Sequence, residues 1–406
     1  MNEQQVRARS AIEALRSGVP SRHCISQLGT TQDEIKSAFE AQVLAAAQGA
    51  AVEPLIIEAG FGEGKSHLLN YFAGNAESRG FVTSMVVISP EMPLGNRHVV
   101  LKAVAETAIA PGLLGRALRA LAHNLKTNSP QYAAIRLWAR SAGLDERFPA
   151  MLQLYEESGT DEEFRTEILG DFEGTPLPIG RVRQKLTETG QSAAYAIKYR
   201  RAADLAHDRI RVLARFYRAC GAVGWAIMFD ELERITYFSV KQRIAVYEEL
   251  GWWAAVAREE GAGIVPVFAS VPEALKHMVE QDAPQFRASS LIRDASDPDI
   301  LPLAGIELIR RGLRLIPPNH EQKAQIQYRV KDIYKTAYEL DPPDTDVAEN
   351  GHSSVRYAIR SWITQWDLHR YDSAYKSNVV MEDVGHEDKP IEDTDLPSDD
   401  DANDAE

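Results

Sequence analysis

The chain has 406 residues, of which 44% are hydrophobic, and its formal net charge is −14. This length exceeds one average domain, so we expect two domains plus tails. Two isolated cysteines, Cys24 and Cys220, are too few for a disulfide framework or a zinc site, and no apolar stretch approaches the ~20 residues that span a bilayer. The composition therefore predicts a soluble cytoplasmic protein without membrane contact.

The first 50 residues show helical patterns. Residues 6–17 are amphipathic, residues 18–22 interrupt the pattern, and residues 32–48 are rich in alanine. We therefore expect an N-terminal helical lead over residues 1–50, followed by an α/β core over residues 51–302.

Residues 55–69, LIIEAGFGEGKSHLL, pass from an apolar run into a glycine-rich turn and then into a helical pattern. This is typical of a phosphate-binding loop, because glycines permit a tight turn that offers backbone N–H groups to a polyphosphate. Lys65 is predicted to reach the β- and γ-phosphates of ATP, and the Ser66 hydroxyl to bind Mg²⁺ at the helix N-terminus. Ala59 replaces the first glycine of the usual pattern, and a loop that no longer binds nucleotide is the alternative. The predicted nucleotide-binding residues are Ala59, Gly60, Phe61, Gly62, Glu63, Gly64, Lys65, Ser66 and His67.

A large helical segment follows the next strand. Residues 81–89 alternate and are rich in β-branched side chains, which predicts a second parallel strand that ends near the loop. Residues 98–109 are helical, and residues 111–219 carry almost no strand signal. We interpret the latter as a helical insertion with helical runs at 132–142, 164–169 and 192–219 and a linker at 170–180.

Residues 225–231, WAIMFDE, form an apolar strand that ends in two carboxylates. Parallel sheets place their functional groups at this end of the strands. Asp230 fits a carboxylate on the Mg²⁺ side of the site, and Glu231 fits the base that deprotonates the attacking water. The pair therefore predicts ATP hydrolysis, the alternative being that the two acids cap the next helix.

Residues 263–270 predict another strand, which ends at Ser270. That hydroxyl is our candidate for sensing the γ-phosphate or holding the lytic water, although a serine that only caps a strand–loop junction is the alternative. Arg287 and Arg293 follow, and either fits an arginine finger inserted into a neighbouring subunit, which would make the protein a homo-oligomer. The alternative for each arginine is a surface salt bridge.

Past residue 302 the chain becomes helical again at 303–315, 321–340 and 353–368, which predicts a helical lid over residues 303–376. Arg356 is placed to reach the nucleotide as a second sensor, unless it is simply solvated. Residues 381–406 hold twelve carboxylates and one lysine, leaving a net charge of −3 on the preceding 380 residues. We expect the tail, residues 377–406, to be disordered and to serve solubility or, alternatively, a partner.

Basic residues gather within the predicted insertion at 181–185, 198–201 and 209–218. Contact with a DNA backbone needs several such groups on one surface, and solvated helix faces are the alternative. No motif that reads bases is assigned.

Over residues 52–370 the chain resembles AAA+ ATPases in the order of its features. These are a phosphate loop, an Asp-Glu strand, a strand that ends in a polar residue, arginines and a helical lid. More narrowly, the strings ARSAIEALRSGVPSRHCISQLGT, AGFGEGKSHLL and FDELERI are similar to the ATP-binding proteins of bacterial BREX phage-defence systems. The resemblance implies an α/β, AAA+-like P-loop NTPase fold, with a parallel sheet flanked by helices, a large helical insertion and a C-terminal helical lid. It also implies oligomerisation, partners among other defence-system proteins and work near DNA.

Two functions remain open from the sequence. The first is an ATP-driven motor or remodelling switch in an anti-phage assembly, which Glu231 favours. The second is a slow, nucleotide-gated regulatory or scaffolding module. A small-molecule kinase fits less well, because Glu231 suits the activation of water and no acceptor-binding element is apparent.

Overall fold

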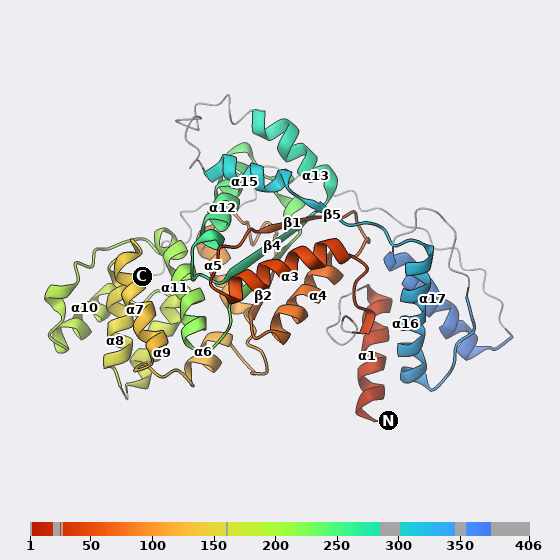
Figure 1. Cartoon of the computed structure of the whole chain (residues 1–406), viewed down its shortest axis with the longest axis horizontal. Coiled ribbons are helices and arrows are strands. Elements are labelled where there is room, and N and C mark those ends of the chain that lie inside the picture. The colour runs from red at the N-terminus through yellow and green to blue at the C-terminus, as the bar shows by residue number, and fades with distance from the viewer. Residues whose placement is uncertain are drawn as a thin grey trace.

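The computed structural model describes residues 2–18, 25, 27–159, 161–284, 301–345 and 355–374. At its centre lies a sheet of five parallel strands in the order β2-β3-β4-β1-β5 (Figure 1). This confirms the predicted α/β class and its parallel sheet. The strands are β1 (Leu55–Glu58), β2 (Val82–Val87), β3 (Trp225–Asp230), β4 (Ile264–Ser270) and β5 (Leu313–Arg314).

Helices cover both faces of the sheet, and this is why its central strands are apolar up to their C-terminal residues, Asp230 and Ser270. Every residue of β3 and β4 is buried, as expected for parallel strands between two helical layers. One face packs against α3 (Asp33–Ala47) and α4 (Lys65–Ser78). The opposite face packs against a larger set of helices: α5 (Arg97–Glu106), α12 (Val240–Arg258), α13 (Pro272–His277) and α15 (Leu301–Arg310).

Between α5 and β3 the described residues form helices and no strand of the sheet, as the sequence predicted. These helices gather at one end of the sheet, away from α1 (Figure 1). We call them the helical insertion; they are α6 (Ala117–Ala122), α7 (Pro130–Ser141), α8 (Arg147–Glu157), α9 (Glu162–Phe172), α10 (Ile179–Glu188) and α11 (Ala206–Ala219). Short turns complete the described elements: 3₁₀ turns η1 (Ser192–Ala194), η2 (Ala203–Leu205) and η3 (Leu232–Tyr237), and the π-helical turn η4 (Met278–Asp282).

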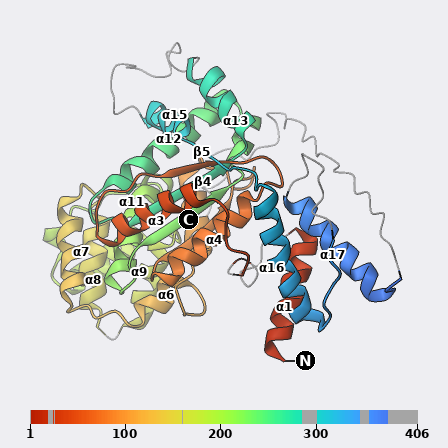
Figure 2. The same ribbon diagram turned by 45° about the vertical axis from the view of Figure 1, so that its right-hand side comes forward.

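The two ends of the described chain meet in a three-helix unit. Helix α1 (Glu3–Ser17) packs side by side with α16 (His320–Tyr338) and α17 (Val355–Tyr371), as Figure 2 shows. Ile12, Tyr334 and Trp362 belong to its separate apolar core. The predicted division into an N-terminal lead and a C-terminal lid stays a prediction, but these two segments contact each other directly.

Two predicted helices are shorter in the structure. The expected helical run at 192–219 is α-helical in α11 only, with the short 3₁₀ turns η1 and η2 before it. Between these two turns Tyr195 and Ile197 are buried on either side of an exposed Ala196, which is the alternation of an extended chain. The expected run at 303–315 ends with α15, and the chain then forms β5, whose Leu313 pairs with Ile57 of β1. A two-residue strand has no periodicity of its own, so only its neighbour defines it.

Candidate functional site

The predicted phosphate loop lies between the end of β1 and the start of α4, the strand–turn–helix context that the motif requires. Gly62 and Gly64 have φ angles of 75° and 108°, which favour glycine. At Gly60 a Cβ atom would lie 3.0 Å from the carboxyl carbon of Glu63. The backbone of the turn therefore favours glycine at positions 62 and 64, while a side chain at position 60 would displace the Glu63 carboxyl.

Strand β3 brings Asp230 to the first turn of α4. The Ser66 hydroxyl donates a hydrogen bond of 2.6 Å to Asp230 Oδ2. Hydroxyl and carboxylate oxygens suit Mg²⁺, which in nucleotide sites takes only one or two protein ligands besides phosphates and waters. Within the described residues no cluster of three or more His, Cys, Asp or Glu side chains could hold a metal by itself, which is compatible with such a sparse site.

Glu231 follows β3 with a left-handed backbone, φ 64°. Its N–H donates to Asp230 Oδ1 at 2.9 Å, and Arg234 Nε lies 3.4 Å from its Oε2. Burial, and then the nearby charge of Glu233, raises the pKa of the Glu231 carboxyl. Glu231 lines a cavity next to the loop.

The loop lysine pairs with Glu233, a residue that was not among the predicted site residues. Lys65 Nζ lies 2.5 Å from Glu233 Oε1, and both side chains are more than nine-tenths buried. Glu233 lies on η3, and it is this 3₁₀ turn, together with the left-handed Glu231, that directs its carboxylate toward the loop. The adjacency of Glu233 to the Asp-Glu pair was visible in the sequence, but its contact with Lys65 depends on the turn.

Ser270 ends β4, directly beside β1. Its backbone oxygen accepts a hydrogen bond from Ala59 N at 3.0 Å, so it adjoins the first residue of the loop. The side chain is fully buried, and among the described residues its hydroxyl has no hydrogen-bond partner. A buried hydroxyl without a protein partner is uncommon, and here it lies at the strand end where the sequence predicts a sensor.

A cavity of about 220 Å³ opens between the loop and the three-helix unit. Apolar side chains of the three-helix unit, among them Leu15, Ile326 and Ile359, line it opposite the loop residues. His67 also lines it; burial lowers the pKa of this imidazole, whose Nε2 lies 2.7 Å from the Gly29 carbonyl oxygen. The cavity is thus bounded by the glycine-rich loop on one side and by apolar side chains of the three-helix unit on the other.

The structure brings one of the three predicted arginines to this cavity. Arg356, on α17, lines it; its backbone N–H donates to the Gly62 oxygen at 3.4 Å, and its side chain packs against Gly18. Arg360, one turn later, instead donates from Nε to the Arg16 oxygen. Arg287 and Arg293 lie outside the described residues, as does the acidic tail.

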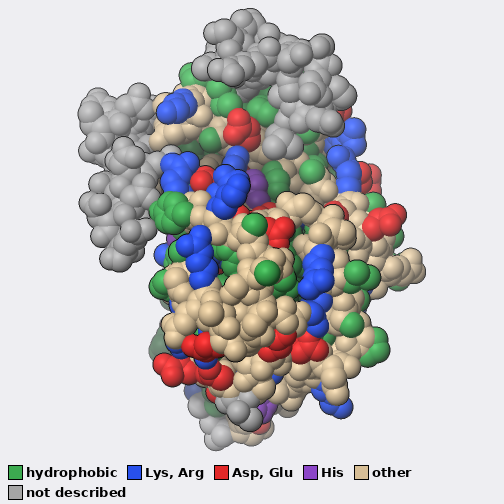
Figure 3. All heavy atoms as spheres, turned by 90° about the vertical axis from the view of Figure 1, so that its left-hand side faces the viewer, with side chains coloured by type: hydrophobic (Ala, Val, Ile, Leu, Met, Phe, Trp, Pro, Cys, Tyr) green, Lys and Arg blue, Asp and Glu red, His purple; other side chains and the backbone are tan. Residues whose placement is uncertain are grey.

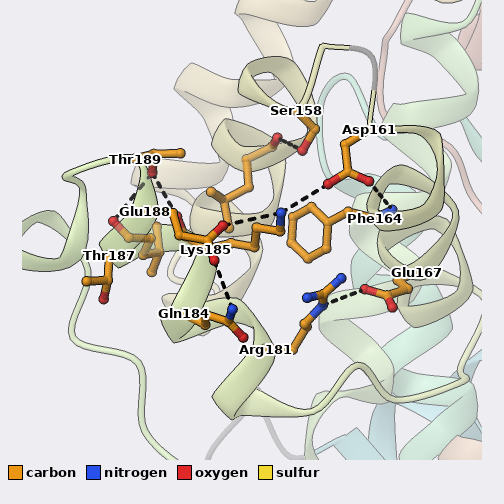
Figure 4. A network of polar contacts seen from close by, with 12 residues as sticks. Ser158, Asp161, Phe164, Glu167, Arg181, Gln184, Lys185, Thr187, Glu188 and Thr189 are labelled. Carbon is orange, nitrogen blue, oxygen red and sulfur yellow. Dashed lines mark hydrogen bonds and ion pairs between the residues drawn. The ribbon is translucent and has the colours of Figure 1, made fainter.

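The basic runs of the insertion mostly neutralise nearby carboxylates. Figure 4 shows Lys185 bonded to Asp161 and Arg181 bonded to Glu167. Arg209 is fully buried and forms a bidentate ion pair with Asp171, so it cannot contact DNA. Basic and acidic side chains both occur on the face of the molecule that carries the insertion (Figure 3).

The loop, the strand-end carboxylates and the cavity lie together at one end of the sheet, and one comparison with known proteins bears on this region. Residues 4–123 match the family model of the BREX system ATP-binding protein BrxC/D. This match includes the phosphate loop and confirms the predicted resemblance to BREX ATP-binding proteins. No curated protein and no solved structure matches the chain. In the described part of the chain no helix combines the length and apolarity that a bilayer span requires.

Proposed function

We propose that this chain binds ATP with Mg²⁺ and hydrolyses it as an AAA+-like ATPase of a BREX-type phage-defence assembly. The observation that carries the proposal is the hydrogen bond between Ser66 and Asp230, which joins the start of the loop helix to the carboxylate end of β3. This is the pairing of loop hydroxyl and strand carboxylate that holds Mg²⁺ in P-loop NTPases. The match to the BrxC/D family supports the ATP-binding part directly.

Each polar group at the site has a role in this proposal. The loop N–H groups and Lys65 bind the phosphates, and Ser66 with Asp230 would hold Mg²⁺, which neutralises charge on the phosphoryl oxygens when bound. Glu231 accepts a proton from the attacking water, a task for which its raised pKa suits it. Ser270 orients that water or contacts the γ-phosphate.

The nucleoside end fits the apolar part of the cavity. The aliphatic side chains of Leu15, Ile326 and Ile359 would pack against the faces of a base. Ligand pockets are commonly lined by apolar side chains. Arg356 lies beside the loop at Gly62, from where its guanidinium would sense a bound phosphate. The nucleotide would thus bridge the sheet and the three-helix unit, so that hydrolysis changes how they contact each other.

We further propose that the protein acts as a motor or remodelling switch, on or near DNA, within a homo-oligomer. An arginine from a neighbour, Arg287 or Arg293, would complete the site in trans. Other proteins of the defence system are the proposed partners, in line with the family match.

Steady-state ATP hydrolysis over a range of protein concentrations, with and without duplex DNA, tests this proposal. We expect specific activity to rise with protein concentration and to rise further with DNA. Lys65→Ala should abolish nucleotide binding, whereas Glu231→Gln should bind ATP and turn it over at least about tenfold more slowly. Wild-type turnover in Glu231→Gln would refute the role of that residue.

A second candidate is a slow, nucleotide-gated scaffold. The contact that favours it is the ion pair between Lys65 and Glu233, because a loop lysine that is already engaged suits infrequent turnover. Tight ATP binding with flat, near-zero hydrolysis at every protein concentration would select this function.

A further inference from the structure

Two carboxylates of the chain itself, those of Glu233 and Glu63, bind hydrogen-bond donors of the phosphate loop. Glu233 Oε1 lies 2.5 Å from Lys65 Nζ. Within the loop itself, Glu63 Oε2 accepts a hydrogen bond of 2.7 Å from the Gly60 N–H. The ammonium and the backbone N–H are the groups that the proposed function assigns to phosphate oxygens. A nucleotide must therefore compete with these carboxylates.

The Lys65–Glu233 pair is buried, and this makes the competition costly for a ligand. Lys65 and Glu233 side chains are 7% and 8% exposed. Removing a charge from water is unfavourable unless an opposite charge compensates, so Lys65 needs a counterion in the absence of nucleotide. Among the described residues, however, the second oxygen of Glu233 has no hydrogen-bond partner. Glu233 therefore neutralises Lys65, but only one of its two carboxylate oxygens has a hydrogen-bond partner. The pair is for this reason less stable than a fully hydrogen-bonded one, and a phosphate can replace Glu233 at Lys65.

Glu233 also adds negative charge where an anion has to enter. Asp230, Glu231 and Glu233 lie within four residues of the chain, and Lys65 is paired with the last of them. Arg234 reaches Glu231 only at 3.4 Å, from a more exposed position. Carboxylates in a partly buried site repel a polyphosphate strongly, because the local dielectric constant is low.

We propose that Glu233 is a positioning residue that holds Lys65 in the nucleotide-free site and thereby limits nucleotide affinity, and that Glu63 does the same at the Gly60 N–H. The inference rests on the proposed function, since it assumes that phosphates bind at Lys65. A phosphate that binds Lys65 must therefore displace Glu233, and one that binds the Gly60 N–H must displace Glu63.

The test is the dissociation constant of ATP and of ADP in EDTA, measured by titration calorimetry on the full chain. Glu233→Gln keeps the shape of the side chain but removes its charge, and we expect it to bind both nucleotides about tenfold more tightly, which equals ~1.4 kcal/mol. Glu63→Gln should tighten binding about threefold. Glu53→Gln, whose carboxylate pairs with Arg258 on the surface, is the matched control and should leave the affinity unchanged.

A purely structural role for Glu233 predicts the opposite sign, because a loop that loses a packing partner binds less well. Unchanged or weaker binding by Glu233→Gln would overturn the inference. If Glu233→Gln shows no cooperative thermal unfolding, it is not folded and cannot be used. The affinity of Glu63→Gln then decides, and unchanged or weaker binding by that variant would overturn the inference. With Mg²⁺ present, Glu233→Gln should lower the KM for ATP without raising kcat.

The outcomes separate this inference from the proposed function. A wild-type chain that binds no nucleotide refutes both. A wild-type chain that binds ATP through Lys65, with no gain in Glu233→Gln, refutes only the inference.

Discussion

The backbone of Glu231 adopts a left-handed conformation that costs a residue with a Cβ atom about 1 kcal/mol or more. Strain of this kind is retained where it directs a functional side chain. We expect Glu231→Gly to raise the free energy of unfolding by about 1 kcal/mol, since glycine adopts this conformation freely, while ATP hydrolysis is lost. Chemical denaturation and steady-state turnover measure the two effects. Glu231→Gln keeps the strained backbone and should lose turnover without the gain in stability.

Ser270 gives a second prediction at this scale. Because its hydroxyl has no partner among the described residues, Ser270→Ala breaks no hydrogen bond within the protein. The free energy of unfolding should change by less than about 0.5 kcal/mol, whereas turnover should fall about tenfold if the hydroxyl acts on the water or the γ-phosphate. Parallel denaturation and hydrolysis measurements check this. A stability loss with intact turnover would show the serine to be structural.

Among the elements, α5 carries a histidine that responds to acid. Burial, followed by the charges of Lys102 and Arg209, lowers the pKa of His98 from 6.5 to about 4. Between these two values the unfolded chain binds a proton that the folded chain does not, so the free energy of unfolding falls as the pH falls from 6.5 toward 4. Above pH 6.5 this residue adds no pH dependence.

Urea denaturation at pH 7, 6, 5 and 4 measures this effect. His98→Asn should flatten the decline, whereas His123→Asn, at an exposed position, should leave it unchanged. An equally steep decline in His98→Asn would assign the acid sensitivity to other groups.

The local elements were predictable from sequence to different degrees. Helix α4 and strands β3 and β4 have strong local signals: a glycine turn before the helix, and long apolar runs in strands that are buried on both faces. Strand β5 has only two residues and is defined by β1, some 255 positions earlier in the chain. A pairing of this range leaves no trace in the local pattern.

The same distinction holds for the site. Lys65, Ser66 and Asp230 follow from motif and strand-end position, and the structure brings the last two into contact. The partner of Lys65 does not follow, because Glu233 reaches it only through the turn after β3. Likewise, the burial of Arg209 against Asp171 could not be read from a run of basic residues, since charge alone does not tell a surface arginine from a buried one.

For the whole molecule, the cavity depends on contacts between distant parts of the chain. Ile12 is fully buried between α1 and its partner helices, and Leu15 on the same helix lines the cavity. Ile12→Ala should lower the free energy of unfolding of this unit by about 2–5 kcal/mol and weaken ATP binding, because one cavity wall loosens. Thermal unfolding and ATP titration measure both. Val6→Ala, exposed on the same helix, is the control, and equal affinity in Ile12→Ala would argue against the cavity as the nucleotide pocket.

Helix α1 is synthesised before the sheet, yet its packing partners α16 and α17 follow some 300 residues later in the chain. Domains generally begin to fold while the chain is still growing, so the sheet and its phosphate loop can form while α1 is still without its neighbours. The wall of the cavity that includes Leu15 and Arg356 is completed only by the last described helix. A nascent or prematurely terminated chain would therefore carry the loop but lack the complete cavity proposed for the nucleotide, and we expect ATP binding only in chains translated through α17.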